Sequence, residues 1–483
     1  MSAPALVEIP SGSCFVGGTW LAVSGESLIE VIDPATEAVI ARVPEASQAT
    51  IAAAFAAARD VQPSWSAMAP EARGAVLDRL AEQIELHGEQ LARLASSEIG
   101  MPIRDSRAGQ VRFPVAVLKV YADLARDYPW EERDASGTTL RREAAGVVLA
   151  ITPWNFPVHQ IIAKIAPALV AGCTVVLKPS ELTPMNALFI AELARRAGLP
   201  AGAFNVVTGT GPLAGQALLT SGAFDVVSFT GSLAVGRHVG ATAGAAIVRA
   251  TLELGGKSPA LVAPDADLDI AVATTVRNCF VNAGQKCNAP TRLLVPEDQR
   301  QAAVEIALRT AREYVIGDPQ DDDTTMGPVS SAAARDRIRG FVQRARDAGA
   351  TVHDTASSLP SRGYFVSPTV ITDVAQSSEI VQEEVFGPVL VIQGYTSLDE
   401  AVGLANDSPY GLSAEVWSAD VGTVRALART IRAGQVRVNG VRTPMPPVSP
   451  FGGMKNSGIG RELGPLGLEE FVEVKAILGD PQS

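Results

Sequence analysis

Apolar residues in the first third of the chain recur at helical intervals. Between Pro70 and Gly100 the leucine and isoleucine positions fall three, four and seven residues apart, with a proline at the start and a glycine at the end. This pattern predicts one amphipathic helix over residues 70–100. Residues 51–58 and 111–125 are predicted to be helical as well. We therefore expect the N-terminal third to be mostly helical cover for a core formed later in the chain.

From residue 146 onward, short β-branched runs alternate with segments long enough to form helices. The predicted strands are residues 147–151, 174–177, 204–207, 226–229 and 247–252. The predicted helices between them are residues 157–171, 184–197, 212–220 and 233–243. This alternation predicts an α/β fold with a doubly wound parallel sheet, which binds nucleotides at the carboxyl ends of its strands.

A second α/β set follows the first. It begins with a predicted strand at residues 259–262 and continues through predicted helices at 267–282 and 299–314. Two α/β lobes with a cleft between them are therefore expected.

The polar stretch 133–145 predicts a protruding hairpin, and the alternating tail 470–478 predicts an edge strand. Such projecting strands with unpaired edges suit contacts between subunits.

Composition narrows the possible partners. The chain has 483 residues, 47% of them hydrophobic, and 40 basic residues against 52 acidic ones, a net charge of −12. This balance argues against a nucleic-acid binder. The longest apolar stretch, 144–176, contains prolines, a lysine and amides that are costly in lipid, so no membrane span is predicted. With no export pattern at the N-terminus, the expected location is cytoplasmic.

Cysteine and histidine are few and widely spaced. The cysteines are Cys14, Cys173, Cys279 and Cys287, and the histidines are His87, His159, His238 and His353. Neither set has the spacing of a disulfide framework or a metal site, so no metal is predicted.

Cys287 is a candidate nucleophile. It follows a predicted helix and a Gly-Gln turn, which exposes a thiol beside backbone N–H groups. The adjacent Lys286 favours a thiolate if its ammonium faces the sulfur. A lone cysteine is more often a small buried apolar residue, so its position alone leaves both roles open.

Two further polar residues follow predicted strands. Glu253 ends the fifth strand and becomes a candidate general base if burial raises its pKa, although it also suits a strand end paired with Lys257. Asn155 lies between Pro153 and Pro157, which restrict the backbone so that its amide can face a site as an oxyanion donor. The alternative for Asn155 is a turn-forming role.

Two glycine-containing loops are candidates for phosphate binding. Residues 208–215 contain G-x-G with the third glycine one position late for the dinucleotide pattern. Residues 229–236 follow a strand and open a helix, where N–H groups and the helix dipole can hold a pyrophosphate. Glu181, after the second strand, can accept hydrogen bonds from an adenosine ribose. Each of these segments is equally consistent with an ordinary turn.

Together, eight motifs resemble the aldehyde dehydrogenase superfamily over almost the whole chain. They are PWNFP at 153–157, KPSE at 178–181, FTGS at 229–232, LELGGK at 252–257, GQKC at 284–287, EEVFGPV at 383–389, NDSPYGL at 406–412 and PFGGMKNSGIGRE at 450–462.

The resemblance implies a mechanism as well as a fold. Cys287 would attack the aldehyde carbon, with Asn155 and the Cys287 N–H holding the oxyanion. Glu253 would activate the water that hydrolyses the resulting thioester, and Lys164 is implied as a further catalytic residue. The presence of Glu253 favours release of a free acid over transfer to coenzyme A.

The resemblance also implies a bound NAD. The implied cofactor-binding residues are Ile151, Thr152, Trp154, Lys178, Ser180, Glu181, Gly211, Gly215, Phe229, Thr230, Gly231, Ser232, Leu254, Gly255, Glu384 and Phe386. The Glu181 carboxylate would repel a 2′-phosphate, so NAD is preferred over NADP, with Lys178 as a partial compensation.

By the same resemblance the chain divides into three parts. Residues 1–127 and 147–254 form a Rossmann-type NAD-binding domain, and residues 255–465 form an α/β catalytic domain. Residues 128–146 and 466–483 form a small β oligomerisation element, which implies a homodimer or homotetramer.

The expected substrate is a medium or large, mainly apolar aldehyde. Ala163 stands where many relatives have a bulky aromatic residue, which suggests a roomy entrance, and the loop 439–449 adds apolar Met445 and Val448. Arg442 in that loop offers an alternative, a semialdehyde whose carboxylate it would pair with. A non-catalytic nucleotide-binding protein is the other alternative, but such a protein would be expected to lack Cys287, Glu253 or Asn155.

Overall fold

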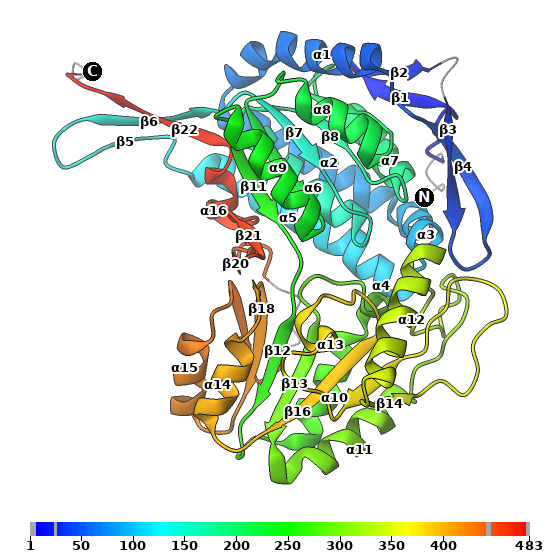
Figure 1. The fold of residues 1–483 in the computed structure, drawn as a ribbon. Helices are drawn as coiled ribbons and strands as arrows, with labels where there is room; N and C mark the ends of the chain where they lie inside the picture. Colours follow the sequence, from blue (N-terminus) through cyan, green and yellow to red (C-terminus); the bar gives the residue numbers. More distant parts are fainter. Residues whose placement is uncertain (1–5, 24–26, 441–445, 480–483) are drawn as a thin grey trace.

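The computed structural model describes residues 6–23, 27–440 and 446–479. Two large sheets, each covered by helices, account for most of the chain (Figure 1). The α/β fold with a doubly wound sheet is therefore confirmed. None of the described helices is long and apolar enough to cross a membrane.

The centre of the first sheet is five parallel strands that match the predicted alternation. In spatial order they are β9 (Phe204–Val206), β8 (Thr174–Lys178), β7 (Val147–Ile151), β10 (Val226–Thr230) and β11 (Arg249–Glu253). The antiparallel strands β1 (Ser13–Val16) and β2 (Thr19–Ala22) extend one edge, and β21 (Gly458–Ile459) extends the other. The chain runs outward from β7 to β9 and then returns to β10 beside β7. The switch point, where such sheets bind ligands, thus lies between β7 and β10.

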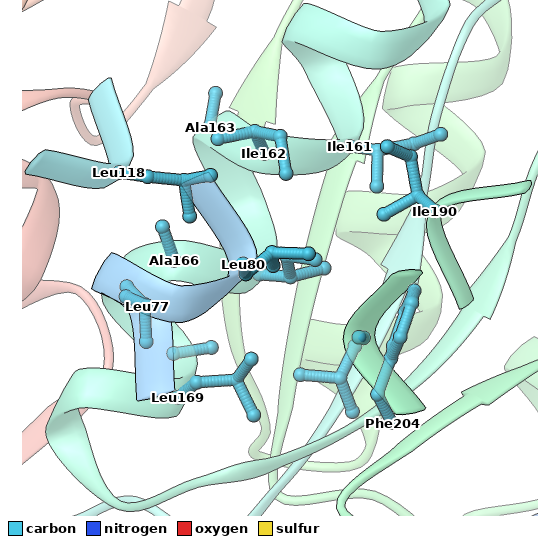
Figure 2. Packing of buried hydrophobic residues seen from close by; sticks show 14 of the residues in the cluster. Leu77, Leu80, Leu118, Ile161, Ile162, Ala163, Ala166, Leu169, Ile190 and Phe204 are labelled. Atoms are coloured by element: carbon cyan, nitrogen blue, oxygen red, sulfur yellow. The ribbon is translucent and has the colours of Figure 1, made fainter. Parts of the chain in front are cut away.

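Both faces of the first sheet are buried. Side chains alternate along β7, so Val148 and Ala150 pack on one face while Val147 and Leu149 pack on the other. Helices whose residues join the first face are α2 (Pro70–Leu86), α3 (Gly88–Ile99), α5 (Phe113–Asp127), α6 (Pro157–Ala171) and α7 (Pro184–Arg196); part of this cluster is drawn in Figure 2. Helices that cover the second face are α1 (Gln48–Ser66), α8 (Gln216–Thr220) and α9 (Leu233–Ala245).

The second sheet repeats this plan. Its strands, in spatial order, are β14 (Thr351–Asp354), β15 (Thr369–Thr372), β16 (Val389–Tyr395), β13 (Pro290–Pro296), β12 (Ser258–Val262), β18 (Ser413–Trp417) and β19 (Gln435–Val438), all parallel except β14. Helices associated with it are α10 (Leu268–Cys279), α11 (Arg300–Ala311), α12 (Ala332–Asp347), α13 (Glu379–Gln382), α14 (Leu398–Asn406) and α15 (Val421–Thr430). The two large sheets therefore form the two expected lobes.

The predicted hairpin and tail strand pair with each other. Strands β22 (Val472–Ile477), β6 (Thr139–Ala144) and β5 (Glu131–Arg133) form an antiparallel sheet that projects from the body in Figure 1. The edge of β6 is therefore covered. Among the described residues, one edge each of β22 and β5 is left without a partner strand.

Short elements complete the chain. They are the two-stranded sheets β3 (Leu28–Asp33) with β4 (Ala38–Pro44) and β17 (Tyr410–Gly411) with β20 (Met454–Lys455), the helices α4 (Ile103–Ser106) and α16 (Gly464–Glu469), the π-helical segments η1 (Arg107–Arg112) and η2 (Gly211–Gly215), and the 3₁₀ turns η3 (Val281–Gly284) and η4 (Glu297–Gln299). The division into three domains stays a prediction.

The N-terminal third is mostly helical, as predicted, but one prediction about it is wrong. Residues 70–100 form two helices, because the chain breaks at His87, which ends α2 and precedes α3. A Cβ at Gly88 would lie 2.8 Å from Val111 Cγ1, so glycine at this break allows the close approach of η1. The region also contains strands β1 to β4 before the first helix. Strand β1 is buried along its length, whereas β2, β3 and β4 are buried only in part, which explains why these three lack a clear apolar alternation.

The core can be tested on helix α2. Leu80 is 2% exposed inside the cluster of Figure 2, whereas Leu86 on the same helix is 55% exposed. We expect Leu80→Ala to lower the free energy of unfolding by about 2–5 kcal/mol, because it leaves a cavity. Leu86→Ala should change it by less than about 0.5 kcal/mol. Urea unfolding followed by circular dichroism measures both; equal effects would contradict this packing.

Candidate active site

A cavity of about 490 Å³ lies at the switch point of the first sheet and is also lined by residues of the second lobe. It brings together ten of the residues predicted from the sequence. These are Trp154, Asn155, Thr230, Gly231, Ser232, Leu254, Gly255, Cys287, Glu384 and Phe386. The first seven come from the ends of β7, β10 and β11, and the other three come from loops of the second lobe.

Cys287 is the partly accessible cysteine of the four. Cys14, Cys173 and Cys279 are fully buried, whereas Cys287 lines the cavity. Loss of solvation raises the pKa of Cys287 to about 12, and nearby carboxylates, first Glu384, add to this effect. The thiol is therefore neutral at pH 7 and needs a base or a change in its surroundings to become a nucleophile.

Asn155 lies just beyond β7, before helix α6 begins at Pro157. Its side-chain amide is 5% exposed, lines the cavity and donates one hydrogen bond to the carbonyl oxygen of Gln285 at 3.1 Å. A primary amide has two N–H donors, so one remains for a ligand in the cavity. This arrangement suits an oxyanion donor.

Glu253 is the last residue of β11 and is 3% exposed. Neither carboxylate oxygen has a hydrogen-bond partner among the described residues. Burial, followed by the neighbouring Glu462 carboxylate, raises the pKa of Glu253 well above its usual range. A carboxyl group whose pKa is raised in this way binds a proton more readily than an exposed glutamate, which suits general acid–base chemistry.

Lys164 lies on α6 with 1% of its surface exposed. Its ammonium donates to Glu462 Oε1 at 2.6 Å and to Ser228 Oγ at 3.1 Å. It also acts electrostatically on Glu253, whose pKa it lowers. Lys164 thus belongs to the buried charges beside the cavity but does not line the cavity itself.

Glu384 and Cys287 meet at the glycine pair that follows β11. Glu384 Oε1 accepts a hydrogen bond from the Gly256 N–H at 2.9 Å. A Cβ at Gly255 would lie 2.3 Å from Glu384 Oε2, and one at Gly256 would lie 2.5 Å from the Cys287 carbonyl oxygen. Only glycines allow both approaches. Burial raises the pKa of Glu384 to about 7.

Two aromatic rings line the same cavity. Trp154 and Phe386 pack edge to face with ring centroids 5.5 Å apart. Phe386 has φ +55°, an uncommon backbone for a bulky residue. Arg337 of α12 donates to the carbonyl oxygens of Glu384 and Val385 on this loop at 3.2 and 2.6 Å. These bonds fix the loop that presents Phe386.

The two candidate phosphate loops differ in whether their N–H groups are occupied. In the loop 208–215 the Glu45 carboxylate accepts from the N–H groups of Thr210 and Ala214 at 3.0–3.1 Å. In the other loop, Ser232 lines the cavity and caps the 13-residue helix α9. The start of α9 is therefore the better site for a pyrophosphate.

The remaining predicted cofactor residues lie away from the cavity wall. Ile151 stands in register with Lys178 and with Phe229 at the carboxyl ends of adjacent strands, and the Thr152 N–H donates to the Lys178 carbonyl oxygen at 3.1 Å. Ser180 follows β8, where its hydroxyl accepts from the Leu182 N–H.

Lys178, the last residue of β8, lies close both to the segment 179–181 and to Gly215 of the loop 208–215. Its ammonium donates to the Pro179 carbonyl oxygen and lies 3.7 Å from Glu181 Oε2. A Cβ at Gly215 would be in ordinary contact with the Lys178 side chain, whereas Gly211 is exposed nearby in η2. This edge and the cavity together fit an extended dinucleotide, with N–H groups at a helix start, two aromatic rings and carboxylates along one crevice.

Several residues of the site had no predicted role. Gln160, Arg337 and Ser330 line the cavity, and Glu462 pairs with Lys164. Glu462 lies within a quoted motif, and the need of Lys164 for a buried counterion is the clue that would have identified it. Among the described residues no group of three or more histidine, cysteine or acidic side chains is placed to hold a metal.

The structure does not give Ala163 the role at the substrate entrance that the sequence suggests. Ala163 is 1% exposed and belongs to the core cluster of Figure 2, so it does not widen the described cavity. Gln160, one turn earlier on α6, lines the cavity instead. Arg442 and Met445 lie outside the described residues, and Val448 is 48% exposed.

Comparison with known proteins identifies the family of the chain. The aldehyde dehydrogenase family model matches residues 20–477. Geranial dehydrogenase of Castellaniella defragrans is 40% identical over 96% of this chain and 98% of its own, and 3-succinoylsemialdehyde-pyridine dehydrogenase of a Pseudomonas species is 39% identical over the same shares. A mutant aldehyde dehydrogenase C of Pseudomonas syringae, solved with NAD⁺ and octanal, superposes with a TM-score of 0.95 at 41% identity over 98% of both chains.

The doubly wound sheet, with a cavity at its switch point, and the family match together place the chain among the oxidoreductases. The chain belongs to the aldehyde dehydrogenase family and is an aldehyde dehydrogenase. The family uses NAD(P), and its substrates are small-molecule aldehydes.

The thiol of Cys287 provides a direct test of the site. Since its pKa is about 12 in the cofactor-free protein, we expect alkylation by iodoacetamide to be slow at pH 7 and to accelerate about tenfold per pH unit up to pH 9. Cys287→Ser identifies the contribution of this residue, because the other cysteines are fully buried. A plateau in the Cys287 rate below pH 8 would contradict the predicted protonation state.

Proposed function

We propose that this protein oxidises a medium or large, mainly apolar aldehyde to the carboxylic acid through a thioester on Cys287. The observation that carries the proposal is the shared cavity of Cys287 and Asn155, next to a strand that ends in a buried carboxyl group with a raised pKa. Nucleophile and oxyanion donor thus share one cavity, and the base ends the strand whose next residues, Leu254 and Gly255, line it.

In the first step the Cys287 sulfur forms a bond to the aldehyde carbon and gives up its proton to a base. The carbonyl oxygen becomes an oxyanion, which the free N–H of Asn155 and the backbone N–H of Cys287 stabilise. Bound NAD would accept the hydride that this carbon loses. Glu384, Phe386, Trp154 and Ser232 are the residues that would hold NAD.

In the second step Glu253 removes a proton from a water molecule, which attacks the thioester carbon. The carbon–sulfur bond breaks, the acid leaves and the Cys287 thiol is restored. Lys164 supports this step by placing an ammonium among the carboxylates, which favours the ionised form of Glu253. A carboxyl group with a raised pKa is, once ionised, a stronger base for this transfer than an exposed glutamate.

We further propose NAD as the preferred cofactor and a homodimer or homotetramer as the assembly. The Glu181 carboxylate, partly exposed beside Lys178, supports NAD because it would repel a 2′-phosphate. The outer edge of β22, without a partner strand among the described residues, supports an assembly through this sheet. The cytoplasmic location stays a prediction from the sequence.

Glu253→Gln separates the two chemical steps. We expect this variant to release about one NADH per active site in a rapid burst and then to turn over at least about 100-fold more slowly than wild type, because hydrolysis has lost its base. Stopped-flow absorbance of NADH measures both phases. Cys287→Ala is the control that should give neither phase while still binding NAD. A Glu253→Gln variant without a burst would mean that Glu253 is already required for acylation.

The substrate class is tested by comparing kcat/KM for octanal and geranial with kcat/KM for succinic semialdehyde. We expect the apolar aldehydes to be preferred by at least about tenfold. Among the relatives, one is named for geranial and one for a semialdehyde, so both classes have a precedent at similar identity. A clear preference for succinic semialdehyde would overturn the apolar assignment and favour a carboxylate-binding residue such as Arg442.

A further inference from the structure

Three buried polar residues around the cavity hold one another in a closed ring of hydrogen bonds. The Asn155 side chain donates to the Gln285 carbonyl oxygen at 3.1 Å, and the Asn282 side chain donates to the Asn155 carbonyl oxygen at 3.0 Å. The Gln285 side chain donates to the Asn282 carbonyl oxygen at 3.0 Å, which closes the ring. None of the three is more than 5% exposed.

The ring is anchored at a fourth point. Gln285 Oε1 accepts from the Ser330 backbone N–H at 2.9 Å, and Ser330 lines the cavity just before α12. Thus the loop after β7, the turn before Cys287 and the segment before α12 are tied together. Three of the four hydrogen bonds join segments that are distant in sequence, so they restrict movements that the chain itself leaves free, while the Gln285–Asn282 bond closes the turn locally.

The turn that carries Asn282 is strained. Asn282 and Ala283 are consecutive residues in the left-handed region, with φ of +52° and +53°. Such a conformation is unfavourable for alanine and less so for asparagine, and a consecutive pair persists only where the surroundings hold it in place. The next residue, Gly284, packs so closely that a Cβ there would lie 2.1 Å from the Gly387 carbonyl oxygen. The ring is one part of those surroundings.

Two hydrogen bonds of the ring hold Asn155 so that the second N–H of its side-chain amide keeps a fixed direction. An amide group is planar, so the hydrogen bond of one N–H to Gln285 also fixes the direction of the other N–H. The backbone of Asn155 is held separately by Asn282. With both the backbone and the amide plane held, the second N–H has little freedom to turn away from an oxyanion, and such fixed donors are the ones that stabilise a transition state.

We propose that Asn282 and Gln285 are positioning residues that hold the oxyanion donor Asn155 and the Cys287 turn in their reactive arrangement. This inference rests on the proposed function of Asn155. In this proposal Asn282 contacts neither substrate nor cofactor. Asn282 therefore affects the reaction only through Asn155.

The test uses Asn282→Gly, which removes the side-chain donor while placing in the left-handed position the residue that adopts it most easily. We expect its NADH burst rate to fall about 100-fold, as for a misplaced catalytic group, with the dissociation constant of NAD changed less than about threefold. Ala283→Gly is the matched control at the adjacent left-handed residue. It relaxes the same strain without removing a donor and should keep the wild-type burst rate.

A double-mutant cycle with Asn155→Ala distinguishes positioning from general damage. If Asn282 acts through Asn155, Asn282→Gly should slow the burst by less than about threefold once Asn155 is alanine. Asn205→Ala removes another buried asparagine, on β9, and its effect should multiply with that of Asn155→Ala. Full multiplication of the Asn282 and Asn155 effects, or a wild-type burst rate in Asn282→Gly, would overturn the inference.

Failure of the proposed function gives a different result. In that case the wild-type protein shows no NADH burst, or Asn155→Ala reacts as fast as wild type, before any change at Asn282 is considered. A normal burst in wild type and a large loss in Asn155→Ala, combined with independent effects of Asn282, would reject only the positioning role.

Discussion

The ion pair between Lys164 and Glu462 is the interaction on which the rest of the site depends. It joins α6, which covers the first sheet, to the segment between β21 and α16 at the far end of the chain. Both side chains are almost fully buried, so removing either would leave a charge without a partner, at a cost of about 3–5 kcal/mol. The same pair surrounds Glu253 with one positive and one negative charge. The contact that fixes the C-terminal segment therefore also acts on the protonation of the candidate base, which burial raises first.

The sequence predicts the central strands and helices of the fold well because burial on both faces imposes a simple apolar pattern on them. Strands buried on both faces must be apolar throughout, and helix 157–171 is bounded by a proline and a glycine, so these elements appear directly as patterns. The helix break at His87 has no such pattern, since both helices continue the same apolar face. At this break Val111 of η1 lies so close that a side chain larger than glycine at position 88 would meet it. Tertiary contacts of this kind cannot be inferred from local spacing.

The candidate site likewise has residues that the sequence indicates and contacts that only the structure reveals. Cys287, Asn155 and Glu253 were recognised because a resemblance supplied their order, while local chemistry left each of them ambiguous. Glu45 illustrates what the sequence could not indicate. Its carboxylate occupies the N–H groups of the loop 208–215, and only the structure shows that these donors are already used. The choice between two similar glycine loops thus rests on a residue more than 160 positions away.

Burial acts on the nucleophile and the base in the same direction. It raises the pKa of Cys287, Glu253 and Glu384, so each of these groups is stabilised in its neutral form. Ionising one of them in this low-dielectric site makes it harder to ionise the next, because like charges repel strongly there. A proton leaving Cys287 therefore needs an acceptor that is already ionised or in contact with water. The ammonium of Lys164, held in place by Glu462, reduces the cost of that ionised state at Glu253, which links the structural ion pair to the chemistry.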